Sequence, residues 1–321
     1  MKIRLGAALS PVLLALSIAS ACSGNSSVSP SPNPTPGPGP IVPAPTPSPP
    51  VTLAGAGDIG DCTAPDHGAN AEATARLIDR MPEAVVFTAG DNAYFDGTAA
   101  EYANCYAPRW GRFRNRTRPS PGNHEYNPPS FGFPYFDYFA DRAGDRGAGF
   151  YSYTLGGWHV VSLNSNTPVG PGSEQLTWLR QDLEMNKLSP TSRCTLAYWH
   201  HPLFTSGPSA GSNALMRPVW QVLYEYGVDV VVNGHDHLYE RFDWMDPTGR
   251  RDSPNAGIRQ YTVGTGGAPL YDFGPRLPTS LFGLKTFGVL KLALRDTGWD
   301  SVFVQAGSEL LVDISMENLC H

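Results

Sequence analysis

Side chains of the kinds that bind metal ions recur along the sequence, each shortly after an apolar run. They are Asp58, Asp91 with Tyr94, Asn123 with His124, His200, and His235 with His237. Carboxylate, phenolate, amide oxygen and imidazole together suit Fe, Zn or Mn better than Ca. The preceding runs are short and rich in β-branched residues, which predicts buried strands. Because α/β sheets build ligand sites at the carboxyl ends of their strands, we expect these side chains to meet at one sheet edge.

Asp91 is the expected centre of this site. It follows the apolar run 84–87, and Gly90 before it allows a sharp turn and a close approach of a ligand. Its two carboxylate oxygens can reach two metal ions at once, and Tyr94, three residues later, can turn toward the same place. The stretch 90–94 therefore predicts a dinuclear metal site, although Gly-Asp by itself is more often a simple turn.

Two further motifs strengthen this interpretation. Gly-Asn-His-Glu spans residues 122–125 and Gly-His-Asp-His spans 234–237. Each is moderately specific alone, and together with the Gly-Asp turns, in this order and after predicted strands, they form a strong signal. Glu125 is either a partner that orients His124 or a surface carboxylate.

In this order the motifs resemble those of the calcineurin-like metallophosphoesterases, and Tyr94 within Gly-Asp-x-x-Tyr resembles the purple acid phosphatase branch. The resemblance implies that Asp58, Tyr94 and His237 hold one ion, expected to be ferric iron. It implies that a second, divalent ion (Fe, Zn or Mn) is held by Asn123, His200 and His235, with Asp91 bridging the two. It further implies a four-layer α/β fold, with two mixed β-sheets between flanking helices.

The implied activity is hydrolysis of small phosphate monoesters. Two neighbouring cations can share a water and lower its pKa from ~15.7 toward neutrality, and the resulting metal-bound hydroxide is expected to attack phosphorus. The resemblance assigns His124 to the substrate, where it stabilises charge or protonates the leaving group. Two alternatives stay open: a phosphodiesterase or nucleotide hydrolase on the same fold, and a non-catalytic surface module.

The sequence also departs from plant-type relatives. Their additional substrate histidines have no obvious counterpart, and His201 is the nearest candidate for such a contact, with packing against Pro202 as the alternative. We also expect no fibronectin-like domain ahead of Val51.

The elements that must position these residues alternate along the early part of the chain. Strands are predicted at 51–57 and 84–87, with a helix at 69–80 between them. Residues 98–110 and 214–226 are further helical candidates, as is a segment that Ser173 can cap. The remaining predicted strands lie at 151–154, 158–163, 194–199, 228–232, 258–263, 288–294 and 301–305. Residues 126–140, rich in aromatics and proline, are interpreted as a loop or lid. These patterns favour one domain, 51–321, with two packed sheets and helices outside them.

The N-terminus has the features of an export signal. A basic start and an apolar stretch are followed by small residues at 19–21, which predicts a signal peptide over residues 1–21. Cys22 then follows the expected cut, as in bacterial lipoproteins, although Ala19 replaces the usual Leu. Lipidation of Cys22, with attachment to a membrane, is therefore one interpretation, and plain secretion is the other. Residues 22–50 are dominated by Ser and Pro, which predicts an extended linker.

Cysteine usage and charge are consistent with an exported enzyme. Apart from Cys22 the chain contains Cys62, Cys105, Cys194 and Cys320, an even set that suggests two disulfides. Three pairings are open, and the positions of Cys62 and Cys105 after metal-motif loops favour Cys62–Cys105 with Cys194–Cys320. The formal net charge of −6 argues against a general nucleic-acid binder. A dense arginine run, Arg109 to Arg118, is interpreted as a solvated ion-paired face rather than an anion-attracting rim. The oligomeric state is not indicated.

Overall fold

The computed structural model describes residues 49–189 and 193–321. The described residues form one compact unit. The predicted signal peptide, the candidate lipidation site Cys22 and the linker as far as residue 48 lie outside the described residues.

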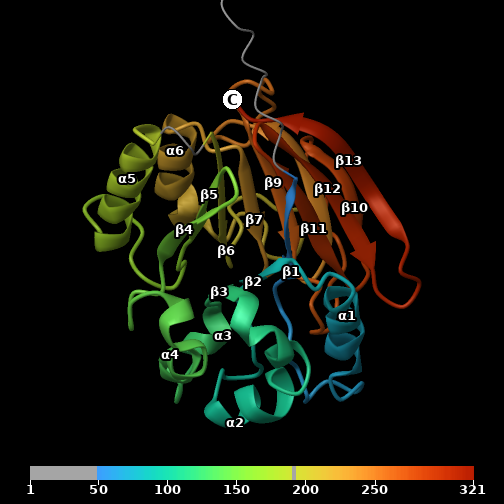
Figure 1. Cartoon of the computed structure of the whole chain (residues 1–321). Coiled ribbons are helices and arrows are strands. Elements are labelled where there is room, and N and C mark those ends of the chain that lie inside the picture. Colours follow the sequence, from blue (N-terminus) through green and yellow to red (C-terminus); the bar gives the residue numbers. More distant parts are fainter. Residues whose placement is uncertain (1–48, 190–192) are drawn as a thin grey trace, which may run out of the picture. The chain divides into compact units, whose positions relative to one another are not determined.

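Two mixed β-sheets form the centre of this unit (Figure 1). The first has the strand order β13-β12-β11-β1-β2-β3, and the second has the order β10-β8-β9-β7-β6-β5-β4. Strands β1, β2 and β3 run parallel, as do β5, β6, β7 and β9, and the other neighbours are antiparallel. The strand bounds of the first sheet are β1 Val51–Ala56, β2 Val85–Ala89, β3 Thr117–Ser120, β11 Gly288–Arg295, β12 Gly298–Gln305 and β13 Leu311–Leu319. Those of the second are β4 Tyr151–Leu155, β5 Trp158–Ser162, β6 Cys194–Trp199, β7 Val230–Asn233, β8 Tyr239–Met245, β9 Ile258–Val263 and β10 Ser280–Leu284.

Helices cover the outer faces of the two sheets. Figure 1 shows α5 and α6 beside the second sheet and α1 beside the first, and α1 contacts β11. The helices are α1 Ala69–Asp79, α2 Ala99–Glu101, α3 Asn123–Tyr126, α4 Phe133–Phe139, α5 Glu174–Lys187 and α6 Arg217–Glu225. As predicted, the Ser173 side chain caps α5, by accepting the Leu176 backbone N–H.

The alternation of side chains along the strands explains the layers. In β6, Leu196 and Tyr198 point into the core between the two sheets, whereas Ala197 and Trp199 point toward the helices. The helix-side core also includes Leu179 of α5 together with residues of α6. Because successive side chains of a strand face opposite ways, an apolar strand such as β6 fills two cores at once. The result is the predicted four-layer arrangement of helices, sheet, sheet and helices.

Several elements differ from the sequence-based expectations. The segment 126–140, predicted as a loop, contains α4, and the predicted helix 98–110 is divided into α2 and a π-helix, Tyr102–Tyr106. The aromatic residues of α4 serve mainly as packing, since Tyr135, Phe136 and Phe139 are buried. Strands β3, β8, β10 and β13 were not predicted.

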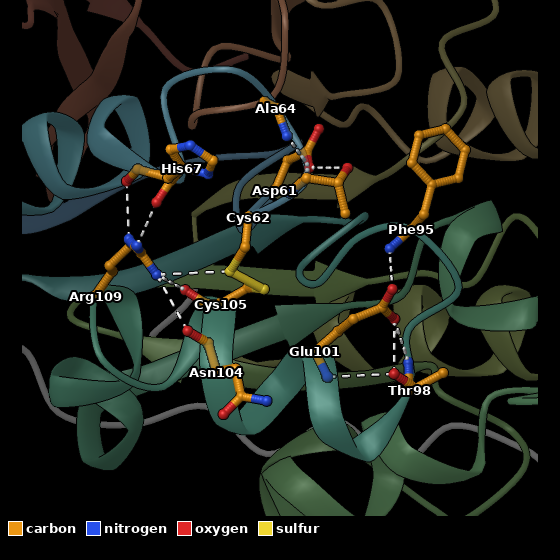
Figure 2. The surroundings of a disulfide bond; sticks show 12 residues. Asp61, Cys62, Ala64, His67, Phe95, Thr98, Glu101, Asn104, Cys105 and Arg109 are labelled. Carbon is orange, nitrogen blue, oxygen red and sulfur yellow. Dashed lines mark hydrogen bonds between the residues drawn. A yellow bond between two sulfur atoms is a disulfide. The ribbon is translucent and has the colours of Figure 1, made fainter.

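Two disulfides tie loops to this framework. Cys62 is bonded to Cys105 and Cys194 to Cys320, the pairing that the sequence favours. The first joins the loop after β1 to the π-helix, and Arg109 lies beside it (Figure 2). The second joins the start of β6 to the C-terminal segment. In the part of the chain that the structure describes, no helix has the length and apolar character needed to cross a membrane.

Candidate metal centre

The predicted ligand residues meet where the parallel strands of both sheets end. Asp58 follows β1, Asp91 follows β2 and His235 follows β7, and all three have positive φ angles of 62°, 50° and 69°. Such left-handed conformations cost of order 1–3 kcal/mol each in non-glycine residues and cluster at functional sites. Asp and His are among the residues that adopt them most often. The sharp turns therefore aim these side chains away from their strands and toward one point.

Asp58, Tyr94 and His237 form a first group of donors. The Tyr94 hydroxyl lies 2.9 Å from Asp58 Oδ1 and 3.2 Å from His237 Nε2. His237 Nε2 lies 3.1 Å from the same Asp58 oxygen. All three side chains are almost fully buried. Oxygen and nitrogen donors thus surround one small volume, as a metal ion of the Fe, Zn or Mn type requires.

Asn123, His200 and His235 form a second group. His200 Nε2 lies 3.1 Å from Asn123 Oδ1 and 3.2 Å from His235 Nδ1. Asp91 connects the two groups, because its Oδ2 lies 3.1 Å from the Tyr94 hydroxyl and 3.1 Å from His200 Nε2. One carboxylate oxygen therefore contacts a member of each group. This is the geometry expected of a residue that bridges two ions.

Backbone carbonyls determine which ring nitrogen faces the site. His200 Nδ1–H donates to the Ala89 carbonyl at 2.8 Å, and His237 Nδ1–H donates to the Pro269 carbonyl at 2.7 Å. In the neutral imidazole this leaves the lone pair on Nε2, the nitrogen that points toward Asp91 in His200 and toward Asp58 in His237. Both rings are therefore oriented for coordination by outer partners.

Glycines before the ligands allow this close convergence. A side-chain β-carbon at Gly122 would lie 2.0 Å from Asp91 Oδ1. One at Gly90 would lie 2.5 Å from His200 Nδ1, and Gly90 also has φ 82°. Any larger residue would displace Asp91 or His200.

The ligand groups strongly influence one another's protonation. Burial opposes the charged form of His200, but the Asp91 and Asp58 carboxylates outweigh it and raise the pKa of His200 to about 9. Burial, together with Asp58 and Asp91, raises the pKa of Tyr94 well above its ordinary value. Without metal, therefore, the protein keeps protons on both groups at neutral pH, and metal binding must displace them.

Glu125 has a different role from either alternative considered from the sequence. It is fully buried, so it is not a surface carboxylate, and its bonds go to the Asp91 loop rather than to the His124 side chain. Its carboxylate accepts the backbone N–H groups of Asp91, Asn92, Ala93 and Gly122 and the Tyr102 hydroxyl, at 2.7–3.3 Å. Burial and the nearby Asp91 charge raise the pKa of Glu125 to about 7, while the N–H donors oppose this. Glu125 holds together the two turns that carry Asp91 and Asn123.

His124 lies beside the bridging carboxylate. Its Nδ1–H donates to the Phe95 carbonyl at 2.6 Å, its Nε2 lies 3.7 Å from Asp91 Oδ2, and its ring centroid is 4.5 Å from that of Tyr94. The backbone N–H of His124 donates to Asp91 Oδ1 at 2.9 Å. The ring is therefore fixed with Nε2 toward the metal centre.

His201 is also drawn into the cluster, on the side of His235. Its ring centroid lies 4.5 Å from that of His235, and its Nδ1 lies 2.7 Å from Ser165 Oγ. Burial and the neighbouring His200 and His235 lower the pKa of His201 to about 2, which keeps the ring neutral. These contacts hold the His201 ring beside His200 and His235, in a group of three imidazoles close enough to share a metal ion.

A cavity of about 320 Å³ opens over the site, and its lining includes residues that the sequence did not indicate. Ser209 belongs to a loop that Asp236 holds by accepting the Ser209 Oγ–H and the Thr205 hydroxyl. Tyr271 stacks flat on His237, with centroids 4.0 Å apart. Neither follows a recognisable motif, and the Gly-Gly pair after β9 is the nearest sequence signal for Tyr271. The cavity lining is Asp91, His124, Pro208, Ser209, His235, Asp236, His237 and Tyr271.

The arginine run makes contacts elsewhere. Arg112 pairs with Glu72 and Asp79, and Arg116 donates to backbone carbonyls that follow or end α1. The Arg112 pairs agree with the ion-paired surface expected from the sequence, whereas Arg116 bonds carbonyl groups rather than carboxylates.

Comparison with known proteins agrees with this geometry. Residues 51–239, which include every ligand candidate, match the profile of the Calcineurin-like phosphoesterase family. The chain belongs to this family. Its relatives include purple acid phosphatase 15 of Arabidopsis thaliana, which is 30% identical over an alignment of 202 residues that covers 51% of this chain and 37% of the relative. Purple acid phosphatase 18 of the same plant is 28% identical over an alignment of 236 residues that covers 68% of this chain and 50% of the relative.

The fold is likewise similar to that of a purple acid phosphatase. A purple acid phosphatase from yellow lupin (Lupinus luteus) seeds superimposes with a TM-score of 0.66 at 20% identity, over 82% of this chain and 53% of that one. Both relatives named above are purple acid phosphatases, so within its family the chain is similar to the purple acid phosphatase-like branch. It spans about half the length, or less, of the relatives named here.

Proposed function

We propose that this calcineurin-like phosphoesterase is a dinuclear-metal phosphomonoesterase of the purple acid phosphatase type. The observation that carries the proposal is the position of Asp91 Oδ2, which touches Tyr94 of one donor group and His200 of the other. A single carboxylate placed between a phenol-containing group and an imidazole-rich group suits a mixed pair of ions.

The donor set fits two metals. Two buried carboxylates, Asp58 and Asp91, lie in one small site with three imidazoles, and positive charge at the centre would offset their desolvation. Asp58, Tyr94 and His237 would hold ferric iron, Asn123, His200 and His235 would hold a divalent Fe, Zn or Mn ion, and Asp91 would bridge them. When bound, the pair would supply a water of lowered pKa and neutralise the charge of the phosphate oxygens.

The chain's own contribution to catalysis centres on His124. With Nδ1–H engaged by the Phe95 carbonyl, Nε2 is the only ring nitrogen free to face a substrate. In the imidazolium form Nε2–H donates toward the ester oxygen, and passing this proton to the leaving group is worth ~10²- to 10⁴-fold in rate. His201, whose Nδ1 is hydrogen-bonded to Ser165, stays a candidate for a further substrate contact, with packing against Pro202 as the alternative.

Paired assays test the proposal. The metal-loaded protein is offered p-nitrophenyl phosphate and bis(p-nitrophenyl) phosphate, and its metals are quantified in the same preparation. We expect two metals per chain and faster cleavage of the monoester. Much faster cleavage of the diester would make the protein a phosphodiesterase, and two bound metals with no hydrolysis of either ester would make it a non-catalytic module.

We further infer that the protein is exported. The two disulfides support this, because such bonds persist in oxidising compartments. The basic and apolar leader and the Ser/Pro-rich residues 22–50 are consistent with release as a secreted protein or with a tether from a lipidated Cys22. Mass spectrometry of the mature N-terminus from a bacterial expression host distinguishes these forms.

A further inference from the structure

Phe95 combines a tightly held backbone with an exposed aromatic ring. Its backbone N–H donates to the Glu101 carboxylate, which also accepts the N–H groups of Asp96 and Thr98. Yet 54% of the Phe95 surface is exposed to solvent. Figure 2 shows the ring directed away from Glu101 and from the disulfide. The fold therefore fixes an apolar ring in an exposed position where it contributes little to the core.

The Phe95 ring lies next to His124, the residue proposed to face the leaving group. Its centroid is 4.8 Å from that of His124, with the planes at 89°, and 6.0 Å from that of Tyr94. The Phe95 carbonyl also orients His124. If His124 protonates the ester oxygen, the organic part of the substrate leaves past His124, where Phe95 is a solvent-exposed neighbour.

A second partly exposed ring, that of Tyr271, lies near the same first group of ligands, beside His237. Tyr271 lines the cavity, is 38% exposed, and rests on His237 with an interplanar angle of 9°. His124 and His237 both contact Tyr94, so Phe95 and Tyr271 each lie beside a neighbour of the same ligand. A flat group leaving the metal centre would thus meet aromatic surface near both His124 and His237.

We propose that Phe95 determines leaving-group specificity, by contacting the ring of phosphate monoesters in which an aromatic group lies close to the phosphate. This inference rests on the proposed phosphomonoesterase function and extends it to a substrate class. The alternative is that Phe95 is one of the isolated apolar residues found on every protein surface. An aromatic contact of this kind is worth about three- to tenfold in binding.

The test compares an aryl ester with an alkyl ester in the same metal-loaded proteins. We would measure kcat/KM for 1-naphthyl phosphate and for glycerol 1-phosphate with wild type, Phe95→Ala and Phe95→Leu. Taking the aryl-to-alkyl ratio in each protein and comparing it between proteins cancels the different intrinsic reactivities of the two esters. Phe133→Ala is the matched control, because Phe133 is similarly exposed on α4 but its ring lies beside Arg146.

We expect the ratio to fall about three- to tenfold in Phe95→Ala, to fall less in Phe95→Leu, and to be unchanged in Phe133→Ala. Binding of benzylphosphonate relative to methylphosphonate, measured by calorimetry, should change in the same direction, with no turnover involved. An unchanged ratio in Phe95→Ala for both esters and phosphonates would overturn the inference. Absence of turnover of both esters by wild type would instead refute the proposed function, and the phosphonate comparison would still decide the role of Phe95.

Discussion

Replacement of Glu125 by Gln tests how the bridging residue is held in place. The Glu125 carboxylate accepts from three donors at Oε1 and from the backbone N–H groups of Asp91 and Gly122 at Oε2. Glu125 itself does not line the cavity over the metal centre. The substitution conserves shape and changes one acceptor oxygen into an NH₂ group.

The magnitude follows from the number of donors that lose an acceptor. If the introduced glutamine keeps its oxygen toward Asn92, Ala93 and Tyr102, its NH₂ group faces the N–H groups of Asp91 and Gly122. A buried donor without a partner costs ~1–3 kcal/mol, so two such donors lower the free energy of unfolding by about 2–6 kcal/mol. The flipped amide would leave three donors without an acceptor, so it offers no relief.

Urea denaturation at pH 8 in the presence of a chelator measures this loss directly, since Glu125, with a pKa of about 7, is then ionised in wild type. The matched control is Glu101→Gln, which also removes an acceptor of backbone N–H groups but at a partly exposed carboxylate, where water can replace it. We expect that control to lose less than ~1 kcal/mol. Stability of Glu125→Gln within ~0.5 kcal/mol of wild type would refute the reasoning.

Four further predictions concern the ligands and a disulfide. Because His200 has a pKa of about 9 without metal, it must release a proton to bind a metal ion. The apparent Kd for Zn²⁺, measured by chelator competition, should therefore fall about tenfold per pH unit from pH 6 to 8. A Kd independent of pH would contradict this. Tyr94→Phe should abolish the visible charge-transfer band of the iron-loaded protein while some hydrolysis survives, and a colourless wild type with tightly bound iron would count against Tyr94 as a ligand. Asp91→Ala should lose at least one metal and nearly all activity, whereas retention of both metals by elemental analysis would remove its bridging role. Replacing both Cys194 and Cys320 by Ala should lower the free energy of unfolding by about 5 kcal/mol, because the disulfide closes a loop with a sequence separation of 126. No loss of stability in calorimetry would contradict this loop-entropy argument.

The strands nearest the metal centre could be predicted because their environment is simple. Runs such as 84–87 and 194–199 are apolar on both faces, since each strand is covered on both sides. The turn residues that follow them carry the ligand motifs, so the gathering of Asp58, Asp91 and His235 follows from topology. The same reasoning fails for β8, where Glu240 and Arg241 interrupt the apolar pattern. Glu240 is nevertheless fully buried, and its carboxylate accepts hydrogen bonds from the Ser206 backbone N–H and the Ser280 hydroxyl.

Other features depend on contacts that are remote in sequence. Glu125 looks like a surface residue of a short helix until the Asp91 loop, more than thirty positions away, is folded onto it. Tyr271 and Ser209 reach the cavity from loops without a motif. The helix α4 was missed because Pro134 and its aromatic neighbours resemble a loop, whereas proline in the first turn of a helix is well tolerated.

The metal centre lies across the seam of the sandwich, since Asp58 and Asp91 come from one sheet and His200 and His235 from the other. Hydrogen bonds that cross between the two sheets include those from His200 to the Ala89 carbonyl and from His235 N–H to Asp58. Metal ions bound by ligands from both sheets would cross-link the two sheets, so that the sheets could not separate without releasing the ions. Metal supply would then affect the stability of the folded domain as well as its chemistry. When free metal exceeds its Kd a thousandfold, binding adds about 4 kcal/mol to the free energy of unfolding.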